Sequence, residues 1–152
     1  MRRVARLPRA SAKIRESFLS IWIEHKTLPL GVRDRRTMAA ALRVLMPAAN
    51  IGLSMTLYRG AAGVERRCRL YRFSWTSKLD IARKFAVHWQ GRDLELQGRI
   101  LPSTGVVLET VAPPNAILLV REQDGYYDEG EVVVDPFKLS RIKVFERLPA
   151  LP

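Results

Sequence analysis

The spacing of apolar residues changes once along the chain, near Asn50, and this change constrains the fold more than any other feature. Before it, apolar residues recur at helical spacing. After it, short apolar runs are separated by glycine and proline, a pattern typical of strands joined by tight turns. Helices followed by a series of strands indicate an α+β fold rather than alternating β–α–β units.

Two helices are expected in the N-terminal part. The first has Ser11 as a candidate N-cap. Its apolar face comprises Ile14, Phe18, Ile21 and His25, with Trp22 beside it. The second helix is expected from about Asp34 to Met46 and is closed by Pro47, which cannot continue a helix.

Six strands are expected in the remainder, at Met55–Arg59, Leu70–Thr76, Gly105–Val111, Ala116–Arg121, Glu131–Val134 and Ile142–Phe145. A further helix is expected between the second and third of them. Its apolar face comprises Leu79, Ala82, Phe85, Ala86 and Trp89. Ser77 and Asp80 have the spacing of a capping box at its start.

The chain of 152 residues suits a single domain, and its formal net charge is +11. Such a charge attracts nucleic acid, an anionic membrane surface or an acidic protein, and it does not choose among them. A role in solubility alone explains the charge equally well. The N-terminal arginines are Arg2, Arg3, Arg6 and Arg9 before the first helix and Arg33, Arg35, Arg36 and Arg43 around the second.

Cysteine and histidine usage argues against a metal site. Cys68 is the single cysteine, so neither an intramolecular disulfide nor a CxxC zinc site can form. His25 and His88 are far apart and have no paired ligands beside them. The basic start is not followed by the apolar run of a secretory signal, and no apolar stretch is long enough to span a bilayer. We therefore expect a soluble, cytoplasmic protein.

Two short motifs occur at the ends of expected strands. Arg59 precedes Gly60, and a guanidinium at that place could hold a phosphate. Ser74 and Thr76 share one face of the next strand, where two hydroxyls could fix a ribose or orient a carboxylate. The ordinary alternatives are a solvated surface arginine and a strand with an aromatic core face followed by a helix cap.

A third motif places Glu129 and Glu131 two residues apart, so in an extended chain both side chains point the same way. Val132 and Val134 then occupy the opposite face. A carboxylate at the mouth of a buried strand could stabilise the oxocarbenium-like state through which glycosidic bonds break. The alternative is a solvated acidic turn before a strand.

Taken together and in this order, the three motifs resemble those of the mono-ADP-ribosyltransferases of the arginine–serine–glutamate class. The resemblance extends from Met55 to Val144 and leaves out the N-terminal helices. It implies a small bacterial or phage-like, toxin-like glycosyltransferase with a split, mostly antiparallel β-sandwich that holds NAD in its cleft. The implied single domain, 1–152, has a helical segment at 1–50 and a catalytic core at 55–147.

The resemblance also implies roles for individual residues. Arg59 would contact an NAD phosphate and help to hold the site together, with Gly60 beside it. Ser74, together with Thr76, would support the nicotinamide ribose and the catalytic glutamate. Glu131 would be that glutamate, which hydrogen-bonds the ribose and stabilises the sugar cation.

The same resemblance assigns the acceptor side of the site. Glu129 matches a position where glutamate goes with arginine acceptors, and Tyr126 and Tyr127 fall in the loop that presents the acceptor. Trp75 and Thr76 depart from the usual Thr and Ser of the serine motif, although Thr76 keeps a hydroxyl.

NAD would be a substrate consumed by the reaction, and the implied chemistry needs no metal. No Gly-x-Gly-x-x-Gly motif follows a strand, so a Rossmann dinucleotide site is not supported. The expected acceptor is a macromolecule, with protein arginine favoured. Two alternatives stay open: hydrolysis of NAD by water, and a non-catalytic basic module that binds nucleic acid or an acidic protein through the N-terminal arginines.

Overall fold

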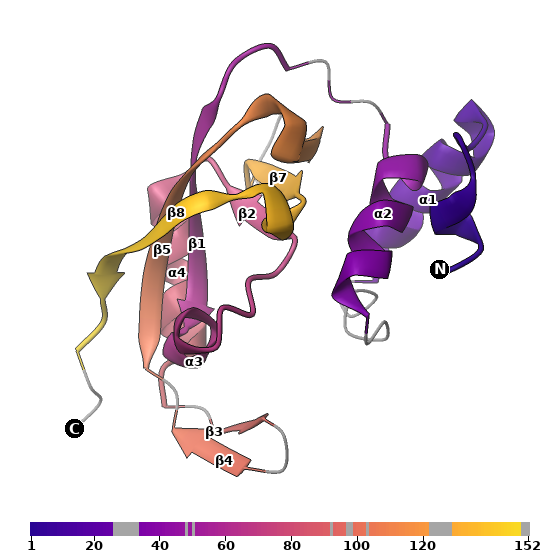
Figure 1. Cartoon of the computed structure of the whole chain (residues 1–152). Helices are drawn as coiled ribbons and strands as arrows, with labels where there is room; N and C mark the ends of the chain where they lie inside the picture. The colour runs from indigo at the N-terminus through magenta and orange to yellow at the C-terminus, as the bar shows by residue number, and fades with distance from the viewer. Residues whose placement is uncertain are drawn as a thin grey trace.

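The computed structural model describes residues 1–25, 34–47, 49, 51–91, 93–96, 99–102, 104–121 and 129–149, with the backbone alone in the two ranges between 93 and 102 (Figure 1). Helices come first along the chain and a largely β part follows, which confirms the expected α+β class. Within the described part, no helix has both the length and the apolar character needed to cross a membrane.

The N-terminal part contains the 3-10 helix η1 (Val4–Arg6) and the helices α1 (Ala12–Glu24) and α2 (Arg35–Leu45). Ser11 caps α1 as expected, because its side chain accepts a hydrogen bond from the backbone N–H of Ile14. The expected apolar face of α1 is only partly buried: Phe18 and Trp22 are in the core, whereas Ile14 and Ile21 are 54% and 44% exposed.

The six expected strands form one sheet in which every pair of neighbours is antiparallel. They are β1 (Met55–Ala62), β2 (Ser74–Thr76), β5 (Gly105–Ala112), β6 (Ile117–Val120), β7 (Glu131–Val134) and β8 (Ser140–Arg147), in the order β6-β7-β2-β1-β5-β8. A separate hairpin of β3 (Asp93–Leu96) and β4 (Arg99–Pro102) is not predicted by the sequence. The remaining elements are α3 (Gly63–Arg67), α4 (Leu79–Trp89), η3 (Pro114–Ala116) and η4 (Pro136–Lys138).

Strand β2 is shorter than the sequence predicts. The expected range of Leu70–Thr76 shrinks to Ser74–Thr76, because the short helix α3 precedes it and the chain has to turn out of that helix. Leu70 donates its N–H to the carbonyl of Glu65 at 2.9 Å, and Arg69 has a positive φ of 52°. Residues before Ser74 are therefore free of the alternation that a strand imposes on its side chains.

Two sets of helices cover one face of the sheet. Val133 of β7 packs into a core cluster with Trp22 of α1 and Met38 of α2. Further along the sheet, Ala82 and Ala86 of α4 pack against Val107 and Tyr58. Figure 1 shows α4 behind β1 and β5, and the N-terminal helices beside the part of the sheet that contains β2 and β7.

The other face of the sheet is filled by Leu57, Trp75, Val132 and Val134. Apolar residues of β8, which is one edge strand, belong to the same cluster as Ile117 of the opposite edge strand β6. The cluster therefore extends across the whole width of the sheet. On the first face, residues of α1 and α4 line a hollow over the sheet.

Candidate functional site

A pocket of about 440 Å³ lies over β1, β2 and β7, between the end of α1 and helix α4. Its volume falls in the range of about 300–1,000 Å³ that is usual for small-molecule sites. Six aromatic residues are among those that line it: Trp22, Tyr58, Phe73, Trp75, Phe85 and Trp89. Flat aromatic surfaces of this kind suit a ligand that contains planar rings.

All the sequence-predicted site residues within the described part of the chain line this one pocket. They are Arg59, Gly60, Ser74, Thr76, Glu129 and Glu131. The two predicted acceptor-loop residues, Tyr126 and Tyr127, lie outside the described residues. The three motifs are separated in sequence, and the antiparallel pairing of β1 with β2 and of β2 with β7 brings them together.

Glu131 is the first residue of β7 and lies directly opposite Thr76 of β2. Its side chain is 17% exposed, and each carboxylate oxygen accepts a hydrogen bond. Arg121, which follows β6, donates from Nη1 to Oε2 at 2.8 Å, and Trp22 of α1 donates from Nε1 to Oε1 at 3.4 Å. A carboxylate held at both oxygens has a fixed position and still has lone pairs left for a ligand hydroxyl.

The hydroxyl of Thr76 makes two contacts within the protein. It donates to the backbone carbonyl of Glu129 at 2.6 Å and accepts from the backbone N–H of Lys78 at 3.0 Å. The residue is only 5% exposed. Thr76 therefore ties the Glu129 turn to the start of α4, whose N-cap is Lys78 and not the predicted Ser77.

The chain between Glu129 and Glu131 is not extended, in contrast to the expectation from the sequence. Gly130 has φ +55°, and a Cβ at this position would come within 2.8 Å of Ser77 Oγ. The left-handed conformation favours glycine and turns the chain sharply before β7 begins. Both glutamates nevertheless line the pocket.

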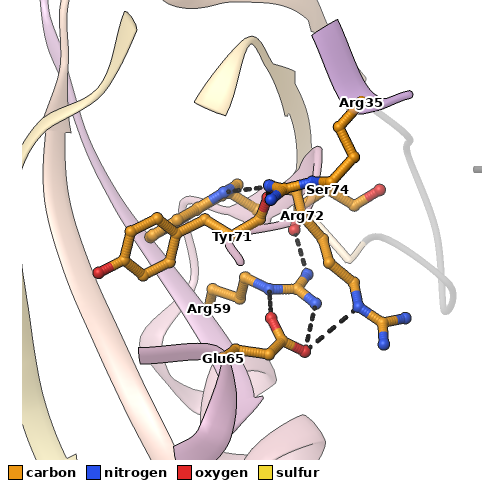
Figure 2. Close-up of polar contacts among 7 residues, drawn as sticks. Arg35, Arg59, Glu65, Tyr71, Arg72 and Ser74 are labelled. Carbon is orange, nitrogen blue, oxygen red and sulfur yellow. Dashed lines mark hydrogen bonds and ion pairs between the residues drawn. The ribbon is translucent and has the colours of Figure 1, made fainter. Parts of the chain in front are cut away.

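All three side-chain nitrogens of Arg59 have partners within the protein (Figure 2). Nε and Nη2 donate to Glu65 at 3.3 and 3.5 Å, and Nη1 donates to the backbone carbonyl of Ser74 at 2.6 Å. Tyr58 of β1 pairs with Thr76 of β2. Beyond this pair the two strands diverge, and Arg59 links them through its hydrogen bond to the Ser74 carbonyl. Arg59 is expected to contact a phosphate and to hold the site together. Its contacts within the protein explain the second of these roles.

Gly60 has a steric reason to be glycine. A Cβ at this position would lie 2.1 Å from the backbone oxygen of Ala82 and 2.3 Å from the backbone nitrogen of Ala86. The absence of a side chain allows α4 to pack directly on β1, and Gly105 of β5 allows the same approach. This close packing fixes the wall of the pocket that α4 provides.

Sequence reasoning missed four residues of the site. Trp22 and Arg121 hold Glu131, Glu65 holds Arg59, and Arg72 lines the pocket. For Glu65 there was a weak signal, since it is the one acid in the stretch from Arg59 to Arg72. Trp22 carries no local signal, because its partner is 109 residues away.

Residues that could bind a metal do not gather in the described part of the chain, where no group of three or more His, Cys, Asp and Glu side chains has suitable positions. His25 and His88, far apart in sequence, both line the pocket. Cys68 is exposed on the surface. Comparisons of the chain with protein-family models, with curated proteins and with solved structures gave no match.

Proposed function

We propose that this chain is an NAD-dependent mono-ADP-ribosyltransferase that modifies protein arginine, and that its six-stranded sheet corresponds to the split β-sandwich of that class. The observation that carries the proposal is the position of Glu131: a carboxylate fixed at both oxygens, on the wall of an aromatic pocket that also contains the arginine and serine motifs. The pocket volume and the planar side chains suit a dinucleotide with two ring systems.

In the proposed reaction, the bond between nicotinamide and ribose breaks and nicotinamide leaves as a neutral molecule with the electron pair. The positive charge that remains on the sugar is stabilised by Glu131. A nitrogen of the acceptor guanidinium attacks the sugar carbon and loses one proton. Glu129 orients that guanidinium and takes the proton, since a free guanidinium stays charged and is a weak nucleophile.

The test measures nicotinamide release from NAD in the presence of an arginine-rich acceptor protein. Glu131→Gln should reduce the rate by about two to three orders of magnitude, the usual cost of one preorganised electrostatic group. The matched control is Glu146→Gln, because Glu146 forms a 2.8 Å ion pair with Arg83 as Glu131 does with Arg121, outside the pocket. Near-normal turnover in folded Glu131→Gln, or no turnover in the wild type, would overturn the proposal.

A substitution at Glu129 tests whether the protein transfers ADP-ribose to arginine or hydrolyses NAD with water. Glu129→Gln should impair arginine modification more than NAD hydrolysis, because the acceptor needs this residue and water does not. Both activities are measured on one preparation, by labelled acceptor and by free nicotinamide. Equal loss of the two activities would mean that Glu129 serves NAD binding, and hydrolysis alone in the wild type would make the protein an NAD glycohydrolase.

A second candidate function, a basic module that binds nucleic acid, has one structural observation in its favour. Helix η1 lies against α2, so the two groups of arginines that are separate in sequence meet around an open hollow, whose charged lining residues are Arg2, Arg6, Asp34 and Arg36. Guanidinium groups suit phosphate contacts. Salt-sensitive binding of duplex DNA or RNA without nicotinamide release would favour this candidate over the enzyme.

A further inference from the structure

Two arginines contact a single buried carboxylate beside the pocket, and a third arginine lies near them (Figure 2). Glu65, whose side chain is 7% exposed, contacts Arg59 and Arg72, each through Nε at 3.3 Å. Arg35 reaches the same place from α2 and donates to the backbone carbonyl of Tyr71, next to Arg72 in sequence. The cluster joins the N-terminal helices to the strands that form the pocket floor.

The charges of this cluster do not balance. Arginine side chains stay protonated in proteins, so three guanidinium groups against one carboxylate leave two positive charges in excess. Burial lowers the pKa of Arg35, and the nearby charges of Arg72 and Arg59 lower it further, whereas Glu65 opposes the shift. Like charges held together in a partly buried place are unfavourable, and a bound anion would relieve that repulsion.

Arg59 and Arg72 differ in what they can offer such an anion. The three nitrogens of Arg59 are committed to Glu65 and Ser74. Arg72 contacts Glu65 through Nε alone, and in Figure 2 its two terminal nitrogens point away from the carboxylate. Its side chain is 38% exposed and lines the pocket.

Trp89 of α4 orients the guanidinium of Arg72. The guanidinium carbon lies 5.4 Å from the centre of the indole ring, which is a cation–π distance. With Nε fixed by Glu65 and the planar group placed over Trp89, the two terminal nitrogens form a preorganised fork. Such a fork matches two oxygens of a phosphate group.

We infer that Arg72 is the phosphate-binding arginine of the pocket, with Glu65 and Trp89 as its positioning residues, and that its ligand is a diphosphate. Two linked phosphate groups offer the planar fork of Arg72 more oxygen acceptors than a single carboxylate does. The inference deepens the proposed function and rests on it for the dinucleotide as the source of the diphosphate. The role that the sequence assigned to Arg59 thus passes to its neighbour in the cluster.

The test is calorimetric titration of the full chain with inorganic pyrophosphate and, separately, with ADP-ribose. Arg72→Gln should weaken binding of both by about ten- to a hundredfold, the cost of losing a hydrogen-bonded charge. Arg72→Lys should lie between, because lysine keeps the charge and loses the fork. Arg83→Gln is the control, since Arg83 is an ion-paired arginine of α4 outside the pocket and its loss should leave binding unchanged.

The outcomes separate this inference from the proposed function, because binding of pyrophosphate requires no bond cleavage. Pyrophosphate binding that depends on Arg72 supports the phosphate site even if nicotinamide is never released. Tighter binding of ADP-ribose than of pyrophosphate identifies a nucleotide as the source of the diphosphate, and binding of pyrophosphate alone identifies the free anion. Wild-type affinity in Arg72→Gln or Arg72→Lys, or no binding of either probe at millimolar concentration, would overturn the inference.

Discussion

Trp22 donates its indole N–H to Oε1 of Glu131 across 109 residues of sequence. This contact makes helix α1, which precedes all three motifs, part of the candidate site. It also gives the N-terminal segment a role besides its charge, because the helix that supplies Trp22 packs on the sheet through the same side chain and Phe18. Glu131 therefore depends on the packing of α1 for its orientation.

The first prediction concerns this contact. Trp22→Phe keeps an aromatic ring in the core and removes the N–H, so nicotinamide release should fall by roughly three- to tenfold, which corresponds to one hydrogen bond. The rate is measured next to the unfolding temperature, which should fall less than in Trp22→Ala. Trp22→Ala is the comparison, since it also removes the packing. A Phe variant as active as the wild type would mean that Trp22 serves packing alone.

The second prediction concerns the ion pair between Arg121 and Glu131. With side chains 15% and 17% exposed, the pair should show a coupling energy of about 1–3 kcal/mol in a double-mutant cycle measured by urea unfolding. The variants are Arg121→Gln, Glu131→Gln and the double variant.

A parallel cycle on Arg83 and Glu146 tests whether burial is the cause. This pair has the same 2.8 Å distance, but its side chains are 50% and 34% exposed, so solvent should reduce its coupling to about 0–1 kcal/mol. Equal coupling energies in the two cycles would show that burial does not strengthen the pair in the pocket.

The third prediction concerns Gly60. Gly60→Ala should destabilise the fold by about 1–3 kcal/mol, because the new Cβ would meet the backbone of α4 and push the helix away from β1. Gly52→Ala is the matched control, since no atom lies within 4 Å of the Cβ it would add. Thermal unfolding measures both. Equal effects of the two substitutions would refute the close approach as the reason for glycine at position 60.

Local signals explain which parts of the structure the sequence could predict. The cap at Ser11, the strand at Glu131–Val134 and the apolar spacing of α2 each depend on neighbouring residues, and each is found in the structure. The three motifs meet in one pocket because β1 pairs with β2 and β2 pairs with β7. The order of the motifs along the chain suggests this pairing but does not determine it. The predictions about activity stay predictions until turnover is measured.

The parts that sequence reasoning missed have a common physical cause. Arg72 was expected inside a strand, where alternation would set its direction, but α3 and the turn at Arg69 shorten that strand and free the side chain. Glu65 and Arg121 are charged residues whose partners are chosen by the fold. Charged side chains usually remain at the surface, so their burial against one another can be recognised only in three dimensions.

The fourth prediction is a pH effect at the start of α2. Asp34 accepts hydrogen bonds from Thr37 and Arg36, and the bond from the Thr37 hydroxyl is the main cause that lowers the pKa of Asp34 below its ordinary value of 3.8. A lowered folded-state pKa means that this contribution to stability is present above about pH 3.8 and is lost as the pH falls through the folded-state value. Asp34→Asn retains a capping residue that does not titrate. The unfolding temperature of the wild type should therefore exceed that of Asp34→Asn at neutral pH, and the difference should shrink as the pH is lowered below 3.8. A difference that stays constant from pH 7 to pH 3 would show that the charge of Asp34 does not contribute to the cap.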